Sequence, residues 1–337
     1  MKHLSIKDIA RLAGVAPSTV SFVVNGKHQE MRISEEMVRH IQSIIKKTGY
    51  IPNRAAASLR TGKTHVIGLI VEDIANSFFA SLAKSVEKAA AKVGYRVVYG
   101  STENNDGRGN DLIQLLAKQV DGFLIAPSIG MKTSVQALKK SRKPLVLIDR
   151  YFPGEEIPFA LVDNYAGVRK ATECLIKKQK KQIAFVNIAT EQVQMQERER
   201  AYVEALQQNG LFQKKLLLRL PYYQDKAQYE PRIHQFLRKH PEIDAMIFAT
   251  NYLGMFGIKA LKDLDIAIPK QVAVFSFDDT DLFRFSSPAI SVISQPVQEI
   301  AGQAMRLLLE QMNSGAKKTE SGEGVLVPPE LILRNSV

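Results

Sequence analysis

The sequence has little cysteine, no long apolar run and no complete catalytic motif, and each shortage excludes a class of protein. Cys174 is the single cysteine among 337 residues, so a disulfide within one chain is impossible. No apolar run approaches the roughly 18 residues of a membrane span. The N-terminal region lacks the apolar core of a signal peptide because Lys7, Asp8 and Arg11 interrupt it. We therefore expect a cytoplasmic protein without a membrane anchor.

Enzyme motifs are present only as fragments. The six histidines show neither H-E-x-x-H spacing nor pairing with cysteine. The stretch GRGND at 107–111 is part of a dinucleotide fingerprint, but it follows polar residues instead of a strand. The acidic stretch DDTD at 278–281 lacks the further oxygen ligands of a calcium loop. We predict that the protein is not an enzyme and uses no metal or cofactor.

Positive charge is concentrated near the N-terminus. The chain has 46 Lys and Arg against 34 Asp and Glu, a net charge of +12. Residues 1–62 contain ten basic and four acidic side chains, which is half of the net charge in under a fifth of the chain. Such a concentration is typical of a surface that binds phosphates of nucleic acid.

Two short amphipathic helices are predicted in the stretch SIKDIARLAGVAPSTVSFVVNG at residues 5–26. Ser5 can cap the first helix together with Asp8, and Gly14 can end it in a left-handed conformation. Pro17 suits the first turn of the second helix, where a missing N–H costs nothing. Two helices joined by three residues predict a helix-turn-helix, whose second helix can enter the major groove of DNA.

A third helix and a short fourth one are predicted next. Ser34 can cap the third helix, which Gly49 closes. Pro52 then breaks the chain before an alanine-rich helix of about two turns at 54–60. Because helices shorter than about 12 residues are marginal alone in water, this one should order only against a partner.

From His65 onward, apolar strands alternate with helical segments in two successive runs. This pattern predicts an α/β fold with parallel sheets in two similar lobes, and a ligand cleft at the carboxyl ends of the strands. Polar or aromatic residues follow several strands. They are Glu72, Asp73, Asn76, Phe78, Phe79, Asp149, Arg150, Asp163, Asn164, Thr250, Asn251, Asp278 and Asp279. Any one of them is as readily a strand-end cap, but together they indicate a site for a sugar or a nucleoside.

In these motifs the sequence resembles the lac repressor and galactose repressor family of bacterial transcription regulators, over essentially its whole length. The matching segments are IKDIARLAGVAPSTVSFVVNG, GYIPNRAAASLRTGKTHVIGLIVEDIANSFFA, VDGFLIAPS, LVLIDR, VDNYAG, FSFDDTDL, ISQPVQEIAGQAMRLLL and VPPELILRNS. The resemblance implies a helix-turn-helix headpiece, a hinge helix and a two-lobed core of the type I periplasmic-binding-protein class. The implied ranges are 1–50 for the headpiece, 51–63 for the hinge and 64–337 for the core, with lobes of about 64–161 plus 291–320 and 162–290 plus 321–337.

The resemblance also implies which residues contact DNA. The set is Ser5, Pro17, Ser18, Thr19, Ser21, Phe22, Asn25, Asn53, Ala56 and Leu59. Many relatives have arginine where Phe22 stands, and phenylalanine can offer a base only apolar contact. Packing of Phe22 into the headpiece core is the alternative. Leu59 matches the hinge leucine that wedges into the minor groove in relatives.

By the same resemblance, a second set contacts a small effector. It comprises Asp73, Phe78, Phe79, Asp149, Arg150, Arg198, Thr250, Asn251, Asp278 and Gln295. An Asn-Asp pair is commoner where Thr250 and Asn251 stand, so an acid is missing. The residue types favour a polyhydroxylated or weakly acidic sugar. A purine, stacked between Phe78 and Phe79, is the alternative.

The resulting hypothesis is a homodimeric repressor that binds an inverted-repeat operator in double-stranded DNA and responds to a small-molecule effector. A sugar-binding transport protein would share the core but would not carry the basic headpiece. Because no leucine heptads follow ELILRNSV, we expect dimers without a tetramerising tail. The sequence leaves open whether the effector releases or strengthens DNA binding.

The wedge role of Leu59 is testable. In the Leu59→Ala variant, binding to operator should weaken much more than binding to random DNA, because only the operator is kinked by the inserted side chain. Fluorescence anisotropy on both DNAs measures this. An equal loss on both would remove the wedge role.

Overall fold

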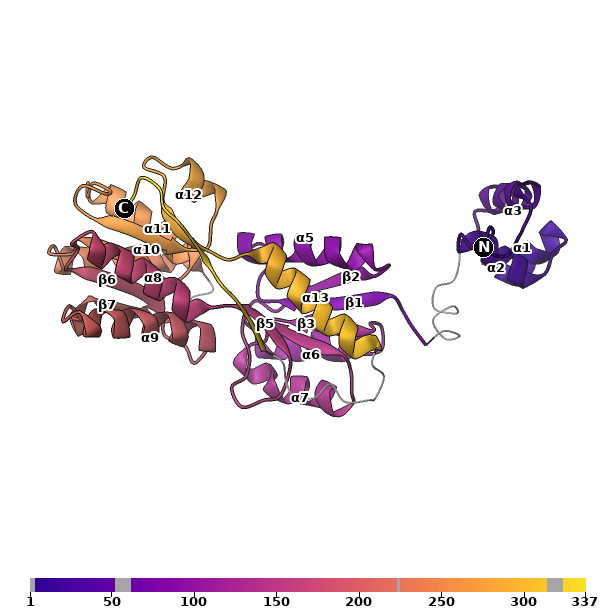
Figure 1. Cartoon of the computed structure of the whole chain (residues 1–337), viewed down its shortest axis with the longest axis horizontal. Coiled ribbons are helices and arrows are strands. Elements are labelled where there is room, and N and C mark those ends of the chain that lie inside the picture. The colour runs from indigo at the N-terminus through magenta and orange to yellow at the C-terminus, as the bar shows by residue number, and fades with distance from the viewer. Residues whose placement is uncertain (1–3, 52–61, 223–224, 314–323) are drawn as a thin grey trace. The chain divides into compact units, whose positions relative to one another are not determined.

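The computed structural model describes residues 4–51, 62–222, 225–313 and 324–337. The chain divides into two compact units, Met1–Thr64 and His65–Val337, which are coloured from indigo to yellow along the chain in Figure 1. The hinge residues Asn53, Ala56 and Leu59 lie outside the described residues, so their roles stay predictions.

Unit 1 contains the predicted helix-turn-helix. Its helices are α1 (Ile6–Ala13), α2 (Pro17–Val24) and α3 (Glu35–Thr48). The capping box at the start of α1 is confirmed, because the Ser5 hydroxyl accepts from the Asp8 backbone N–H and the Asp8 carboxylate accepts from the Ser5 backbone N–H. Gly14, at φ +67°, ends α1 in the left-handed conformation. Pro17 occupies the first turn of α2, as predicted.

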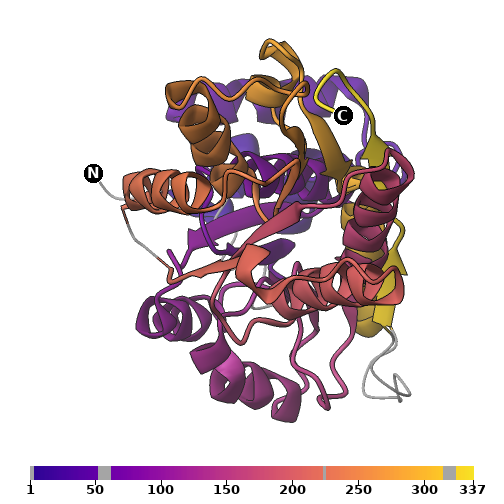
Figure 2. The ribbon, with the colours of Figure 1, turned by 90° about the vertical axis from the view of Figure 1, so that its left-hand side faces the viewer.

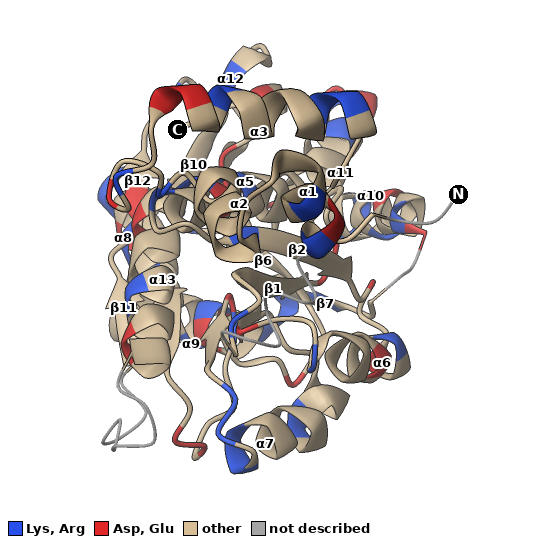
Figure 3. Cartoon of the chain, turned by 90° about the vertical axis from the view of Figure 1, so that its right-hand side faces the viewer, with Lys and Arg blue, Asp and Glu red and all other residues tan. Residues whose placement is uncertain are grey.

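The three helices enclose one small core. Ser34 caps α3 by accepting from the backbone N–H of Met37, and Gly49 at φ +64° ends it. Figure 3 shows the acidic start and the basic end of α3, a distribution that favours the helix dipole. The buried apolar residues of this unit are Ile9, Ala10, Ala13, Val20, Val23, Val38, Ile41 and Tyr50.

In unit 2, the first lobe, here called the N-lobe, has a parallel sheet in the order β11-β5-β4-β3-β1-β2. The strands are β1 (Val66–Val71), β2 (Arg96–Ser101), β3 (Gly122–Ile125), β4 (Leu145–Ile148), β5 (Phe159–Val162) and β11 (Gly324–Val327). The helices are α5 (Ser77–Lys92) and α13 (Val297–Asn313) on one face, and α6 (Asp106–Leu116) and α7 (Lys132–Lys140) on the other, with a 3-10 turn η1 (Ile129–Met131) before α7.

The second lobe, the C-lobe, has a sheet in the order β12-β10-β9-β8-β6-β7, parallel except for the antiparallel pair β10 and β12. The strands are β6 (Ile183–Ile188), β7 (Leu217–Leu220), β8 (Ala245–Phe248), β9 (Ala273–Phe277), β10 (Ser291–Ser294) and β12 (Glu330–Ile332). Figure 2 shows α8 (Asn164–Lys177) and α9 (Val193–Gln208) on one side of this sheet, and α10 (Tyr229–Lys239) and α11 (Asn251–Asp263) on the other. Shorter helical segments are η2 (Lys214–Leu216), η3 (Lys226–Gln228) and α12 (Asp281–Phe285).

The chain crosses between the lobes three times, and two crossings come later than predicted. Strand β10 (Ser291–Ser294) pairs with β9, so it belongs to the C-lobe and not to the N-lobe range 291–320. Strand β11 (Gly324–Val327) pairs with β5, so it belongs to the N-lobe and not to the range 321–337. Both strands are short apolar segments whose partners lie far away in the sequence, so local pattern could not assign them to a sheet.

The interior strands read as continuous apolar runs because helices cover both faces of each sheet. In β1, β3, β4 and β8, nearly every residue is buried. Close helix packing has a strict requirement at Gly257 of α11. A Cβ atom placed there would lie 2.1 Å from the ring of Phe248, which is fully buried in β8.

Gly257→Ala should therefore destabilise the core by about 1–3 kcal/mol, because the buried ring cannot move away without displacing its neighbours. Gly302→Ala in α13 is the matched control, since a Cβ atom there meets nothing within 4 Å. That change should stabilise by up to about 1 kcal/mol through helix propensity. Urea midpoints report both effects, and stabilisation by both changes would refute the close-packing argument.

Candidate functional site

A cavity lies between the two lobes, at the carboxyl ends of strands from both sheets. This is where ligands bind in open α/β sheets. Its lining residues are Glu72, Asn76, Phe78, Phe79, Asn104, Asp149, Arg150, Ile188, Thr190, Gln192, Gln194, Met195, Arg198, Tyr222, Thr250, Asn251, Tyr252, Asp278 and Gln295.

All the predicted effector residues except Asp73 line this cavity. The Asp73 carboxylate instead accepts from the backbone N–H of Ala75 at 2.8 Å and stabilises the turn after β1. Its neighbour Glu72 reaches the cavity in its place. The strand-end pattern included both acids, and the structure brings Glu72 to the cavity lining.

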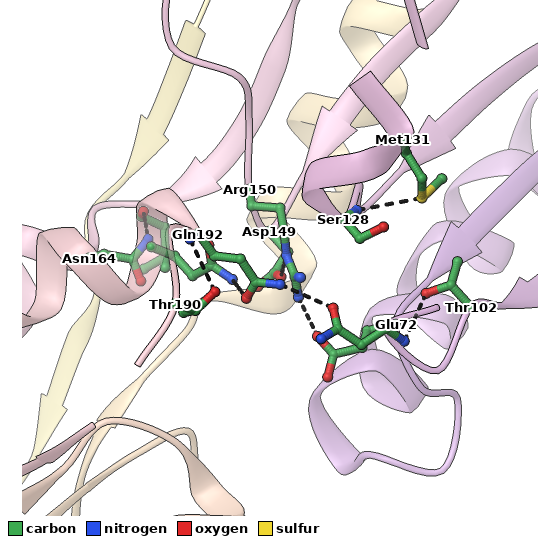
Figure 4. Close-up of polar contacts among 12 residues, drawn as sticks. Glu72, Thr102, Ser128, Met131, Asp149, Arg150, Asn164, Thr190 and Gln192 are labelled. Atoms are coloured by element: carbon green, nitrogen blue, oxygen red, sulfur yellow. Dashed lines mark hydrogen bonds and ion pairs between the residues drawn. The ribbon is translucent and has the colours of Figure 1, made fainter. Parts of the chain in front are cut away.

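A buried ion cluster forms one wall of the cavity. Figure 4 shows Arg150 between Asp149 and Glu72. Its Nε donates to Asp149 Oδ2 at 2.8 Å, and its Nη2 donates to Glu72 Oε2 at 2.6 Å. Burial alone would lower the pKa of Arg150, but the two carboxylates outweigh it and raise that pKa. The guanidinium is therefore fixed in place and fully charged.

A second buried arginine is held differently. Arg198, from α9, donates through Nε to Asn164 Oδ1 at 2.7 Å and through Nη1 to the backbone carbonyl of Ala249 at 2.6 Å. Its Cζ lies 3.4 Å from the centre of the Phe277 ring. Burial lowers its pKa, and Asp278 is the first of the acids that oppose this effect. No carboxylate among the described residues forms a direct ion pair with Arg198, so donors of its guanidinium remain for a ligand.

Asp278 faces this arginine from the end of β9. Its Oδ1 accepts from Gln295 Nε2 at 2.7 Å. Burial raises the pKa of Asp278 to about 6, although Arg198 and Gln295 act in the opposite direction. Asp149 and Asp278 follow β4 and β9, one in each lobe, and both have left-handed backbones, at φ +63° and +67°. Such strain in non-glycine residues concentrates at functional sites.

The structure adds cavity residues that were not predicted. Tyr222 and Tyr252 follow β7 and β8, Gln192 directly precedes α9, and Gln194 lies in its first turn. Applying the strand-end rule to β7 as well would have found Tyr222, because it comes two residues after that strand. Gln194 is 2% exposed, and its Oε1 has no hydrogen-bond partner.

Phe78 and Phe79, the two aromatic residues predicted to contact the effector, meet edge to face. The Phe78 and Phe79 rings have centroids 4.9 Å apart and planes at 60°, and both side chains are buried. They therefore do not present two parallel faces that could enclose a flat base.

Figure 4 shows polar residues, including Thr190 and Gln192, gathered near Asp149.

In unit 1, the predicted DNA-contacting residues lie on or beside α2. Pro17, Ser18 and Asn25 are exposed, and Thr19 and Ser21 are half-buried. The Asn25 side chain donates to the backbone carbonyl of Ser21 at 2.7 Å. Ser5 is exposed at the start of α1, where it serves as the cap.

Phe22 is half-buried and is not among the apolar residues that pack against the headpiece core. Its position is thus compatible with the base-facing role and gives no support to the alternative of a core residue.

One group of possible metal ligands lies outside the cavity, where Glu230, His234 and Asp263 have ligand atoms within 4.8 Å of one another. The Lys259 ammonium already lies 2.9 Å from the Glu230 carboxylate and 2.6 Å from that of Asp263. These residues thus form an ion-pair network around a lysine.

Among the helices that the structure describes, none combines the length and the hydrophobicity that a membrane span requires.

Comparison with known proteins gives two family matches. Residues 5–53 match the family described as "Bacterial regulatory proteins, lacI family", and residues 172–337 match the "Periplasmic binding protein-like domain". Among relatives, catabolite control protein A of Priestia megaterium is 28% identical over 337 residues and covers 99% of each chain. The ribose operon repressor of Escherichia coli (strain K12) is 29% identical over 318 residues and covers 91% of this chain and 93% of its own.

Solved structures of the same fold are also found. The lac repressor dimer bound to operator and the anti-inducer ONPF has a TM-score of 0.84 and 20% identity, covering 99% of both chains. The transcriptional regulator CelR in complex with cellobiose has a TM-score of 0.72 and 24% identity, covering 99% of this chain and 100% of its own. At these identities, the likeness establishes the fold alone.

The raised pKa of Asp278 makes stability depend on pH. Between about pH 4 and pH 6 the folded protein retains a proton on Asp278 that the unfolded chain has lost, so rising pH destabilises the fold. Relative to Asp278→Asn, which tolerates the left-handed backbone, the wild-type free energy of unfolding should fall by about 3 kcal/mol over this range.

Urea unfolding of both proteins at several pH values measures this difference. Asp279→Asn is the control, because Arg334 and Arg284 outweigh burial and lower the pKa of Asp279. For Asp279, the wild-type advantage should instead diminish as the pH falls. Parallel curves for wild type and Asp278→Asn would contradict the burial argument.

Proposed function

The chain belongs to the lacI family of bacterial regulatory proteins, and from this premise we propose that a small sugar or sugar derivative, bound in the cavity between the lobes, controls its affinity for DNA. The regulators matched along essentially its whole length include a catabolite control protein and ribose operon repressors. DNA binding and transcription regulation are properties of this family.

The cavity's unused hydrogen-bonding groups are the observation that carries the effector proposal. Arg198 has free N–H donors, Asp278 has an oxygen beyond the one that Gln295 uses, and Gln194 has a buried acceptor without a partner. A sugar hydroxyl both donates and accepts, so neighbouring hydroxyls can satisfy donors and acceptors placed side by side. Leaving these groups unpaired in a closed cavity costs free energy that such a ligand recovers.

The aromatic geometry favours a sugar over a purine. A purine sandwich between Phe78 and Phe79 would need two parallel faces, whereas these rings meet edge to face. One face of Tyr222 is covered by the Lys226 ammonium, whose Nζ lies 3.8 Å from the ring centre. Most of the lining residues carry polar groups, interspersed with aromatic side chains, and such groups can pair with the hydroxyls of a polyhydroxylated ligand.

The Arg150 cluster contributes rigidity to the site. Because Arg150 is already paired with Asp149 and Glu72, it is committed to the protein and does not provide a free cation for an acidic ligand. Its role in the proposal is to hold Asp149 in a fixed orientation, with carboxylate lone pairs left for ligand hydroxyls.

On the DNA side, we propose a homodimer whose two α2 helices occupy major-groove half-sites of an inverted repeat, so that the protein acts in the cytoplasm as a repressor. The exposed positions of Pro17, Ser18 and Asn25 support this role for α2. The chain runs from α3, which ends at Thr48, to β1, which begins at Val66. A change in the N-lobe can therefore reach the headpiece along the covalent chain, and couplings of about 1–3 kcal/mol are typical of such systems.

Arg198→Lys tests the effector site. Lysine keeps the positive charge, but it cannot make both hydrogen bonds and also stack on Phe277, so affinity for the responsive sugar should fall about tenfold or more. Operator binding without effector should be unchanged. Fluorescence anisotropy of labelled operator, titrated with a panel of neutral sugars, measures both quantities.

Arg200→Lys on the same helix is the matched control. Arg200 lies on the exposed side of α9 and pairs with Glu197 and Glu204, so its replacement should leave the sugar response intact. An unchanged titration in Arg198→Lys would show that the cavity residue Arg198 does not bind the effector. A loss of operator binding without effector would assign it a structural role instead.

A further inference from the structure

Direct hydrogen bonds join the two lobes across the cavity. At one place, Asn76, just before α5 of the N-lobe, bonds to Asn251, the first residue of α11 in the C-lobe. At another, Gln192 of the C-lobe donates through Nε2 to Asn104 Oδ1 of the N-lobe at 3.1 Å. These contacts involve neutral groups only, so the described residues bridge the lobes without a salt bridge at either place.

Nearly all of the bonding capacity of the Asn251 amide is used in this bridge. Its Nδ2 donates to Asn76 Oδ1 at 3.0 Å and to Ser77 Oγ at 3.4 Å, and its Oδ1 accepts from Asn76 Nδ2 at 3.3 Å. The side chain is 5% exposed. Both N–H groups therefore point to the other lobe, and one oxygen lone pair remains, which makes Asn251 a poor candidate for the main ligand contact.

The partner's orientation is fixed independently. Asn76 Oδ1 also accepts from the backbone N–H of Phe78 at 3.0 Å and so caps α5. Turning the Asn76 amide over would place an NH₂ group against that backbone N–H. Its oxygen must consequently face α11, where Asn251 Nδ2 donates to it, while Asn76 Nδ2 donates in return to Asn251 Oδ1. A carboxylate at either position would place oxygen against oxygen.

We propose that Asn251 is a positioning residue, which with Asn76 forms a clasp that holds the two lobes closed before any effector binds. Closure brings Phe78 of the N-lobe and Asp278 of the C-lobe to the same cavity. The effector then meets an assembled site and does not have to draw the lobes together by its own binding energy. This inference concerns the effector-free protein and does not rest on the identity of the effector.

The test compares two isosteric changes. Asn251→Asp removes the donor that Asn76 Oδ1 requires, so the open population should rise about tenfold, the shift expected for losing one or two neutral hydrogen bonds. Asn105→Asp is the matched control, because it adds the same charge at the N-cap of α6, outside the cavity, where Asn105 Oδ1 accepts from the backbone N–H of Arg108 at 3.0 Å. It keeps that cap and should remain close to wild type. A general effect of added charge would make the two variants alike.

Distances between spin labels report closure in the full chain without DNA or effector. Labels at Lys118→Cys in the N-lobe and Lys239→Cys in the C-lobe, both exposed positions, are introduced with Cys174→Ala. Labelled protein is diluted with unlabelled protein so that measured pairs lie within one chain. The wild type and Asn105→Asp should show one short distance, and Asn251→Asp should add a longer one.

Asn251→Ala provides a second variant, in case the aspartate prevents folding; it should also open the cleft, with an unchanged circular dichroism spectrum. A single unchanged distance in both Asn251 variants would overturn the clasp. Equal opening in Asn105→Asp and Asn251→Asp would also overturn it, because the opening would then follow from added charge alone. The measurement uses neither sugar nor DNA, so a failure here is distinguishable from failure of the proposed function.

Discussion

The constraint on which the rest of the structure depends is that the carboxyl ends of two parallel sheets meet at one cavity. The chain passes between the lobes after β5, after β10 and after β11, so three chain segments join the two sheets. Residues that follow strands in either lobe, such as Asp149 and Asp278, are thereby brought to a shared site. Because both lobes contribute residues to the cavity, ligand binding is coupled to the arrangement of the lobes. A ligand changes the populations of the arrangements only if it binds one of them more tightly than another.

The charged residues of this site fall into two groups, one paired within the protein and one with hydrogen-bonding groups left for a ligand. Arg150 is neutralised locally by Asp149 and Glu72, a buried arrangement that is stable only while all three groups stay in place. Arg198 and Asp278 influence each other without a direct ion pair, and their remaining donors and acceptors are free to take ligand hydroxyls. The neutral clasp between Asn76 and Asn251 joins the lobes without changing this balance of charge.

Much of this could be predicted from the sequence, because the signals were local. Caps at Ser5, Gly14 and Ser34 act within a turn or two, and an acid directly after an apolar strand, as at Asp278, marks the edge where ligands bind. The missed features depend on pairing across long separations. The sheet membership of β10 and β11, the choice of Glu72 over Asp73, and the contact of Asn76 with a residue 175 positions away are decided by packing that no window of sequence contains.

The central claim is that binding of a sugar in the core changes the affinity of the headpiece of the same chain for DNA. Its most direct test is fluorescence anisotropy of the purified protein on labelled DNA from upstream of its own gene and its neighbours, repeated with neutral sugars and with purines. The account predicts tight, salt-sensitive binding to one fragment, with an affinity that a sugar changes and purines do not. Binding that shows no preference over random DNA, or that only a purine alters, would contradict it.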